Sequence, residues 1–314
     1  MFNAFNFSKE KNGLIYYLLK QVYKSLAQPV LIQIHRKKLL SHRLIFCINS
    51  GRCGSGYLAK LLGSAKEVRS YHEPVPQMIG HYLHMINDRP YADSFHERHI
   101  KNNAIKKLLL RFPKGKIYCE TNHMFIETFF DVVLSEFKNV DVIILRRELC
   151  LVLKSFIKLG YFSNRNSNWP HWMSSPGAKT AALKSIAADE VLDQYDLCIA
   201  YLIDNEARAV RFKNDYPMVR THEVRVESLS DYSSVQKLFA NLAITPTNET
   251  SNFYMKKINV REEMKNEVNN NVDLEYCKER IAMYLDKANR MGIALPKSLA
   301  LDPYNKKSAT TSRA

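Results

Sequence analysis

The chain has 314 residues, 46% of them apolar, so it can form one large domain or two small ones with a sizeable core. Its formal charge is +15, from 46 Lys and Arg against 31 Asp and Glu. This surplus favours an anionic partner: a nucleotide, a nucleic acid, an acidic glycan or an anionic membrane surface. A basic surface with no dedicated ligand is the alternative. The sequence shows no internal repeat and no long low-complexity block.

The six cysteines are not spaced as a metal site, because no pair forms a CxxC motif and no Cys-His zinc spacing occurs. Cys47 and Cys119 lie in apolar, strand-like runs, where a buried free thiol is usual. The sequence therefore predicts a reducing compartment, the cytoplasm, and no metal site.

Residues 1–43 are predicted to form a helical N-terminal extension. Apolar residues recur at helical spacing from Leu14 to Leu26. Lys20, Gln21 and Lys24 interrupt this stretch, which is too short and too polar for a transmembrane span or a signal sequence. The favoured interpretation is a helix packed on the flank of the domain. Peripheral contact with a membrane surface is the alternative, because basic residues follow at 36–38.

Residues 44–302 are predicted to form one α/β domain, followed by a polar, disordered tail over 303–314. In chain order we predict a strand at 44–49, a helix at 55–63, a strand at 67–72, helices and loops over 76–112, a strand at 116–120, a helix at 125–137, a strand at 140–145, a helix at 148–159, a loop at 164–177, a helix at 178–212, a strand at 218–226, and helices at 232–242 and 274–291. Strands alternating with helices predict three layers, with a central, mainly parallel sheet flanked by helices as in P-loop NTPases. Ligands of such folds bind at the carboxyl ends of the strands.

The turn from Ser50 to Leu58 joins the first strand to its helix and contains three glycines. Glycines let the backbone approach an oxyanion, and the amides of the following helix point at it. Arg52 adds a planar cation. The glycine spacing matches a Walker A loop, but Tyr57 and Leu58 stand where that loop needs Lys and then Ser or Thr. This counts against ATPases, GTPases and kinases. A glycine-rich turn without a ligand stays open as an alternative.

The same turn resembles the 5'-phosphosulfate-binding loop of the sulfotransferase superfamily, in which Lys or Arg precedes Ser-Gly-Thr or a similar triplet. Arg52 takes the place of the basic residue, Cys53 stands where Ser is usual, and Gly54 and Ser55 match the last two positions. The resemblance covers roughly residues 44–244. It implies that 3'-phosphoadenosine 5'-phosphosulfate (PAPS) is the donor co-substrate, held here by Gly51, Arg52, Cys53, Gly54, Ser55, Gly56 and Tyr57.

A second match concerns the 3'-phosphate, which this family binds with an Arg at a strand end and a Ser eight residues later. Arg147 follows the predicted strand at 140–145, and Ser155 lies eight positions beyond it, about two turns into the next helix. The family commonly has Asp or Asn and then Pro after the Arg, whereas this chain has Glu148 and Leu149. A solvated strand-end charge and a neutral helix hydroxyl are the alternative interpretations of the two residues.

A third match concerns the general base. In several branches, including the protein-tyrosine sulfotransferases, a Glu near the end of the second strand takes the acceptor's proton, and Glu73 occupies that position. His72 is its neighbour. Because adjacent strand residues face opposite ways, we expect one of the two to point away from the acceptor, and we favour Glu73 as the base over His72.

The resemblance implies in-line transfer of a sulfuryl group from PAPS to a hydroxyl or amine, without a metal ion, with Arg52 also stabilising the leaving phosphate. The acceptor is an unidentified small molecule or glycan. Its cleft is expected to be lined by Tyr71, His72, His123, Trp169, Pro170 and Trp172. A non-catalytic nucleotide- or glycan-binding protein and a nucleotide kinase stay open as alternatives. No nucleic-acid partner is predicted, because zinc fingers, aromatic RNA-binding motifs and dense Lys/Arg runs are absent from the sequence. The sequence does not indicate an oligomeric state.

Overall fold

A computed structural model describes residues 17–18, 20–113, 115–183, 186, 191–254 and 271–301. At its centre lies a five-stranded sheet in the order β2-β3-β1-β4-β5, and each neighbouring pair is parallel. The strands are β1 Leu44–Ile48, β2 Val68–His72, β3 Ile117–Thr121, β4 Val140–Arg146 and β5 Arg220–Arg225. The predicted α/β fold with a parallel central sheet is confirmed.

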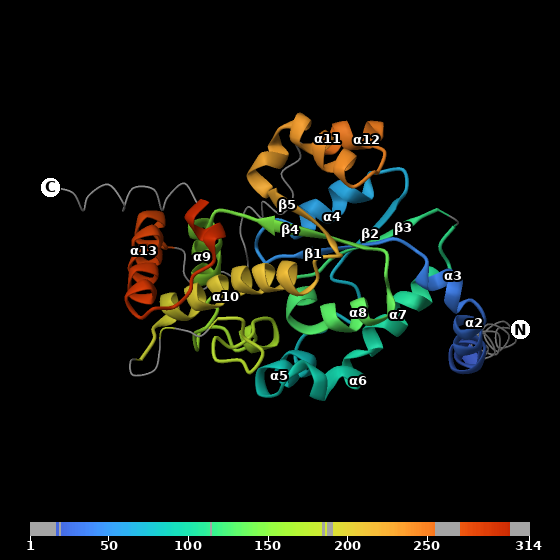
Figure 1. Ribbon diagram of the computed structural model, residues 1–314, viewed down its shortest axis with the longest axis horizontal. Helices are drawn as coiled ribbons and strands as arrows, with labels where there is room; N and C mark the ends of the chain where they lie inside the picture. The colour runs from blue at the N-terminus through green and yellow to red at the C-terminus, as the bar shows by residue number, and fades with distance from the viewer. Residues whose placement is uncertain are drawn as a thin grey trace, which may run out of the picture.

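Helices cover both faces of the sheet, as Figure 1 shows. One core cluster joins the sheet to α4 Ser55–Gly63, α9 Leu149–Lys158, α11 Tyr232–Asn241 and α13 Leu274–Arg290. The other joins it to α5 His81–Asp88, α7 Ile100–Leu109 and α8 Phe130–Glu136. The long helix α10, Gln194–Asp215, contributes residues to both clusters.

The remaining helical segments are η1 Tyr23–Ala27, α2 Gln28–Ile34, α3 Arg36–Leu40, η2 Tyr91–Ser94, α6 Phe95–Arg98, η3 Phe125–Phe129, η4 Trp169–His171, η5 Val226–Ser230, α12 Asn248–Phe253 and η6 Lys297–Leu301. Within the described ranges, none of the helices combines the length and the apolar character that crossing a bilayer requires.

Strand β1 shows why an unbroken apolar run forms the centre of the sheet. All five of its residues are buried. Ile45 and Cys47 enter one core cluster, whereas Leu44, Phe46 and Ile48 enter the other. A strand covered on both faces needs apolar side chains at every position, because successive residues point to opposite sides.

The predicted helix at 178–212 is wrong over the described residues 178–183 and 191–193, because they are not helical and α10 begins at Gln194. The side chain of Asp193 accepts a hydrogen bond from the Asp196 amide and so fixes the helix start. The backbone amides of Ala182 and Leu183 instead donate to the Asp204 carboxylate, at 2.6 and 2.9 Å. These hydrogen bonds to a residue of α10 outweigh the helix propensity of the Ala-rich segment.

The N-terminal helix also differs from prediction. Its helical segments continue to Leu40, and α2 touches the domain mainly at α7. Within the predicted stretch, Leu18, Val22 and Leu26 are exposed, whereas Ile32 and Leu39 further along the chain pack on the domain. The predicted tail over 303–314 lies outside the described residues, as do positions 14–16 and 19 of the predicted stretch from Leu14 to Leu26.

The turn between β1 and α4 holds three residues in the left-handed region, with φ of 77° at Gly51, 55° at Arg52 and 87° at Gly54. Gly54 is the N-cap of α4. A Cβ atom at Gly54 would lie 2.7 Å from Cγ2 of Val226, at the start of η5. Glycine is therefore required there twice, by its φ angle and by the close approach of a second segment.

We expect Gly54→Ala to destabilise the fold more than Gly292→Ala, which has a similar φ of 70° but open space around its Cβ position. The left-handed conformation costs roughly 1–2 kcal/mol in either variant, and overpacking against Val226 adds about 1–3 kcal/mol at Gly54 only. Urea unfolding measures both. In the double variant Gly54→Ala/Val226→Ala, the added cost should disappear as a coupling energy. Equal losses for the two glycines would contradict the close packing.

Candidate active site

A cavity of about 740 Å³ opens at the carboxyl ends of the strands, where ligands of parallel α/β folds bind. The β1–α4 turn forms one wall, and residues that follow β2, β3 and β4 form the floor. The segment after α9 closes the opposite side. Its charged and imidazole side chains are those of Arg52, His72, Glu73, His123, Arg147 and Arg165. With three Arg side chains against one carboxylate, the cavity is suited to an anionic ligand.

Arg52 and Arg147 line this cavity, and Arg52 contacts Ser155 of α9, although about a hundred residues separate Arg52 from the other two. Arg52 donates from Nε to the Ser155 hydroxyl at 3.0 Å. Arg147 donates from Nη1 to the Arg52 carbonyl at 3.0 Å. The three residues come from the β1–α4 turn, the end of β4 and helix α9. Two guanidinium groups and a hydroxyl therefore converge where a phosphate oxygen would find several donors.

The other residues of the turn divide between the cavity and the core. Gly51, Gly54, Ser55, Gly56 and Tyr57 line the cavity. Cys53 does not, because its side chain is buried with 3% exposure.

The Cys53 thiol contacts the Ser50 hydroxyl at 3.0 Å and the Gly51 carbonyl at 3.2 Å. Burial raises the pKa of Cys53 to about 11. The side chain of Cys53 therefore belongs to the packing of the turn, and only its backbone remains to face a ligand. All six cysteines lie in the described part of the chain, and none forms a disulfide.

Tyr57 lines the cavity, and contacts at its hydroxyl and at its ring hold the side chain in place. Its hydroxyl contacts the carbonyls of Leu229 and Tyr254, at 3.2 and 2.6 Å. Its ring lies nearly parallel to that of Phe253, with 6.4 Å between ring centroids. A ring held in this way is a rigid apolar surface on which a planar base can stack.

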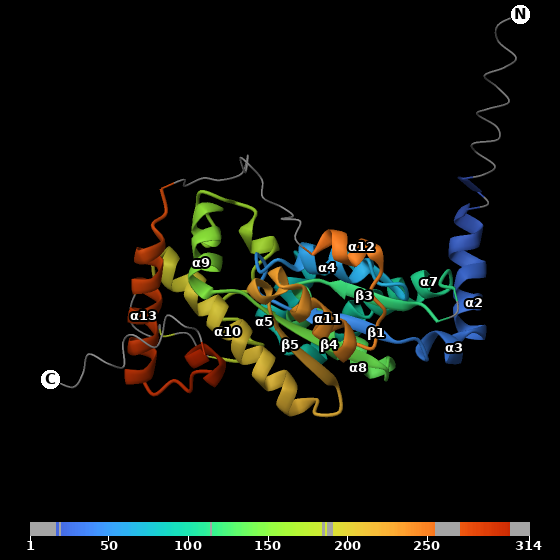
Figure 2. The ribbon, with the colours of Figure 1, turned by 90° about the horizontal axis from the view of Figure 1, so that it is seen from above.

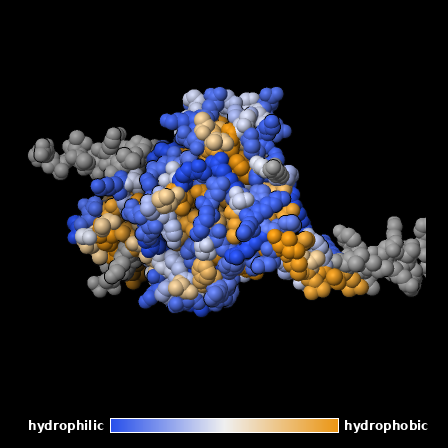
Figure 3. All heavy atoms as spheres, turned by 45° about the vertical axis from the view of Figure 1, so that its right-hand side comes forward, coloured by the Kyte–Doolittle hydropathy of each residue, from blue (hydrophilic) through white to orange (hydrophobic). Residues whose placement is uncertain are grey.

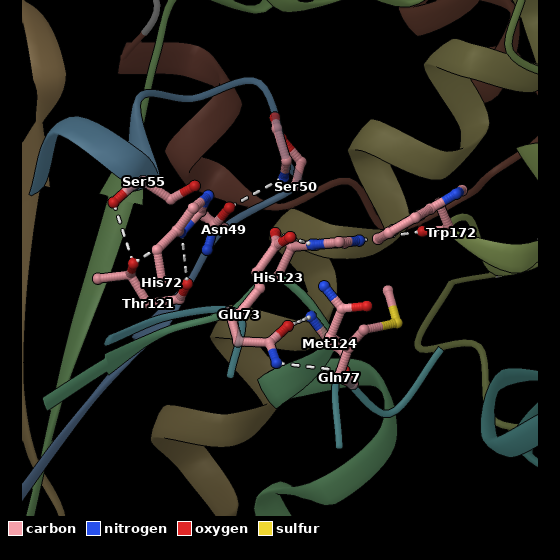
Figure 4. A network of polar contacts seen from close by, with 12 residues as sticks. Asn49, Ser50, Ser55, His72, Glu73, Gln77, Thr121, His123, Met124 and Trp172 are labelled. Atoms are coloured by element: carbon pink, nitrogen blue, oxygen red, sulfur yellow. Dashed lines mark hydrogen bonds and ion pairs between the residues drawn. The ribbon is translucent and has the colours of Figure 1, made fainter. Parts of the chain in front are cut away.

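His72 and Glu73 both line the cavity. The backbone of Glu73 leaves the extended conformation with a φ of 47°, so the alternation of strand residues ends there. His72 Nδ1 lies 2.9 Å from the Thr121 carbonyl, which can only accept, so Nδ1 carries the proton. The Thr121 hydroxyl in turn donates to the Ser55 carbonyl at 3.0 Å, which links β2, β3 and α4 (Figure 4).

Glu73 forms an ion pair with His123, whose ring lies between Glu73 and Trp172 in Figure 4. His123 Nδ1 is 2.9 Å from Glu73 Oε1, and Nε2 is 3.1 Å from the Trp172 carbonyl. Because a carbonyl and a carboxylate both accept, both ring nitrogens donate and the imidazole is charged. Residues of β2, β3 and the loop after α9 are thus held together.

The pKa values of the pair move in opposite directions. Burial alone would raise the pKa of Glu73, but the hydrogen bond and charge of His123, with His72 and Lys101 adding to them, hold it below its usual value. Burial alone would lower the pKa of His123, but the hydrogen bond and charge of Glu73 raise it above its usual value. Near neutral pH, Glu73 is therefore an ionised carboxylate inside a largely cationic cavity.

A buried charge network lies behind this site. Lys101 Nζ is 2.6 Å from Glu120 Oε1, and their side chains are 1% and 0% exposed. The same ammonium donates to the carbonyls of Pro74 and Pro76, at 3.2 and 2.9 Å. Asn122 donates both to Glu120 Oε1, at 3.0 Å, and to the Gln77 carbonyl, at 3.2 Å. The segment directly after Glu73 is thus fixed to β3 and α7.

Several cavity residues were not singled out by the sequence motifs. The segment after α9 contributes Tyr161, Arg165, Asn166, Ser167 and Asn168.

His123 was expected only to line the cleft, and its pairing with Glu73 was missed. The signal was available in the strand order, because β2 and β3 end side by side, with His72 paired to Thr121. Of the predicted cleft aromatics, Trp172 lines the cavity, whereas Trp169 packs on Phe162 and Tyr71 on Tyr118.

No protein-family model and no curated protein matches the chain. Among solved structures, a sulfotransferase from Mycobacterium avium is similar to it, with 14% identity, a TM-score of 0.44 and coverage of 84% of this chain and 82% of that one. A sulfotransferase from Alicyclobacillus acidocaldarius has 12% identity and a TM-score of 0.43, covering 80% of this chain and 96% of that one. The sulfotransferase domain from the curacin biosynthetic pathway has 14% identity and a TM-score of 0.42, covering 78% and 98%. Each of these three proteins is a sulfotransferase.

The ion pair predicts a measurable titration. In NMR spectra of histidine-labelled protein, the ring of His123 should titrate above its ordinary value of 6.5. Glu73→Gln removes the charge and leaves the burial, so the midpoint of His123 should fall. Glu223→Gln, which neutralises an acid bonded to Arg146 and Lys213, serves as the matched control and should change nothing.

The same pair sets a pH window for stability. Because the pKa of His123 is raised on folding, its contribution to stability is fully present below pH 6.5 and is lost as the pH rises through the folded-state pKa. Because the pKa of Glu73 is lowered on folding, its contribution is fully present above pH 4.5 and is lost as the pH falls through the folded-state pKa. The contribution of the pair is therefore greatest between these two values. A His123 midpoint that is the same in wild type and Glu73→Gln would refute the ion pair.

Proposed function

We propose that the protein is a PAPS-dependent sulfotransferase that transfers a sulfuryl group to a hydroxyl or amine. The observation that carries the proposal is that Arg52 and Arg147 line one cavity with an ionised Glu73, while Arg52 also contacts the Ser155 hydroxyl. Two cationic groups and a hydroxyl suit a ligand with two separate phosphates, and the carboxylate suits the removal of a proton.

The residues fit the donor group by group. The β1–α4 turn has left-handed residues that bring its backbone close to a ligand, and it leads into the first turn of α4. Arg52 and Ser55 would hold the 5'-phosphosulfate there. Arg147 and Ser155 would hold the 3'-phosphate, which ATP lacks. Tyr57 would support the adenine ring.

When bound, PAPS supplies the sulfuryl group: its S–O bond to the 5'-phosphate breaks as a new S–O or S–N bond to the acceptor forms, releasing adenosine 3',5'-bisphosphate. Arg52 stabilises the negative charge that grows on the leaving phosphate oxygen. Glu73 takes the proton from the acceptor hydroxyl or amine onto a carboxylate oxygen. His123 orients that carboxylate through its hydrogen bond to Oε1. The mechanism assigns no step to a metal ion.

The acceptor side of the cavity is polar with one large aromatic. Arg165, Asn166 and Asn168 supply hydrogen-bonding groups, and Trp172 supplies a ring. Such a lining suits a carbohydrate, whose hydroxyls need partners and whose ring faces pack on aromatic surfaces. We therefore propose a small-molecule or glycan acceptor.

Calorimetric titration with adenosine 3',5'-bisphosphate in the presence of EDTA tests the donor site. We expect metal-independent binding that Arg147→Ala weakens by about 10- to 100-fold, because a charge-assisted hydrogen bond contributes roughly 1.5–3 kcal/mol. Arg165→Ala removes another Arg of the same cavity and should weaken binding much less. Absence of bisphosphate binding, together with ATP binding that requires Mg²⁺, would overturn the proposal in favour of a nucleotide kinase.

Turnover with labelled PAPS and a panel of acceptors tests the base. Glu73→Gln should lower kcat by about 10²- to 10⁴-fold without weakening bisphosphate binding, which is typical of a lost general base. His72→Asn keeps an N–H donor for the Thr121 carbonyl and should lower kcat by less than about tenfold. In the wild type, the acid limb of kcat/KM should lie below 4.5, because the pKa of Glu73 is lowered. The reverse order of the two variants would assign the base to His72.

A further inference from the structure

The first described part of the chain is an arm of helices that projects from the domain. This N-terminal arm comprises residues 17–18 and 20–40, with η1, α2 and α3 following one another to the start of β1. In Figure 2 the arm stands at the edge of the molecule, away from the layered core. Its attachment to the domain is slight, because α2 contacts mainly α7.

The arm carries its apolar side chains on the outside. Leu18, Val22, Leu26, Val30 and Ile34 are 52%, 52%, 65%, 58% and 69% exposed. They recur every fourth residue and so follow one side of a helix. In a regular α-helix, residues spaced four apart rotate around the helix axis by about 40° at each step. The π-helical turn η1 holds more residues per turn, which reduces this rotation and keeps the five side chains on one side. Figure 3 shows the resulting hydrophobic surface along the projecting arm.

The opposite side of the arm is the one that meets the domain. Gln28 is buried with 4% exposure, and Ile32 packs against the core cluster that includes α7. Gln28 and Ile32 thus face the protein, while five large apolar residues face outward. A helix that only covered the flank of its own domain would have the reverse arrangement, because burying the apolar side is what stabilises it. The outward side therefore has the character of a binding surface.

The charge of the arm indicates what binds there. The sequence has no Asp or Glu from residue 11 to residue 66, and it has five Lys or Arg within the arm, at positions 20, 24, 36, 37 and 38. A second copy of the arm would bring like charges together, on chains that each carry a formal charge of +15. An anionic lipid surface offers both a boundary for the apolar side and negative charge for the basic residues.

We propose that the N-terminal arm binds peripherally to an anionic membrane surface, lying in the interface with its apolar side toward the acyl chains. The arm leads into the amino end of β1, whereas the cavity is built at the carboxyl ends of the strands. In Figure 1 the arm is at the edge of the sheet away from α9, which contributes Phe156 to the cavity. Membrane binding by the arm consequently leaves the cavity open, and the two functions can be tested separately.

Co-sedimentation of the full chain with vesicles tests the proposal. We expect binding to vesicles of phosphatidylcholine mixed with phosphatidylserine, much weaker binding to phosphatidylcholine alone, and loss of binding as salt rises. Leu26→Gln/Ile34→Gln removes apolar contact without changing charge and should lower the partition coefficient by roughly tenfold or more. Lys37→Gln/Lys38→Gln should abolish most of the preference for the anionic lipid.

Met218→Gln/Met283→Gln is the matched control, because these residues are 93% and 65% exposed on the domain itself. It should bind vesicles like the wild type. Equal binding by Leu26→Gln/Ile34→Gln and wild type would overturn the proposal, as would absence of binding to anionic vesicles. A concentration-dependent dimer in light scattering that only the arm variant dissociates would instead assign the surface to a second copy of the chain. Bisphosphate affinity, measured in every variant, reports whether the domain is intact.

Discussion

The buried contact between Lys101 and Glu120 is the interaction on which the geometry of the cavity depends. Both side chains are withdrawn from water, which is costly for each charge unless every partner is in place. Here the partners are in place: Lys101 reaches two further carbonyls, and Glu120 also accepts from Tyr118 and Asn122. Removing one member of such a pair typically costs about 3–5 kcal/mol, because the other is left buried and unpaired.

What this pair fixes is the chain that follows β2. The two carbonyls bound by Lys101 belong to Pro74 and Pro76, so the ammonium holds the segment that carries Glu73. Glu73 needs that support, because a side-chain-bearing residue with a φ of 47° persists only where its surroundings determine it. The unusual backbone is also what brings Glu73 into the same cavity as His72. The main effect of the buried pair is therefore to fix the position of the segment after β2, since a buried ion pair contributes little net stability.

On the other side of the cavity, the β1–α4 turn is also held in an unusual backbone conformation by contacts with distant residues. Arg52 has a φ of 55°, and its carbonyl is held by Arg147 while its guanidinium is held by Ser155. The turn therefore adopts its shape through partners from β4 and α9, as well as through its glycines. The two walls of the cavity are set by residues far apart in sequence, and the parallel sheet brings them together because all its strands end at one edge.

This difference between local and tertiary causes explains how much the sequence could predict. The parallel sheet followed from apolar runs such as 44–48, and the cavity-lining turn followed from its glycines and Arg52, because those signals are local. The pairing of Glu73 with His123 could not be read from 50 intervening residues without the strand order. Likewise the segment 178–183 has helical composition but gives its amides to Asp204 in α10. For the arm, periodicity reveals an apolar side of a helix but not what that side faces.

The charges of the cavity also bear on how a carboxylate with a lowered pKa can act as a base. Surrounded by His123, His72 and Lys101, Glu73 is ionised at neutral pH but holds a proton weakly. In the proposed reaction, a donor with several negative charges is bound by Arg52 and Arg147 in the same cavity. Its charge would offset those cations and raise the proton affinity of Glu73, because like charges disfavour the ionised form. Glu73 would then be the stronger base when the donor is in place, so that charge alone would couple donor binding to proton removal from the acceptor.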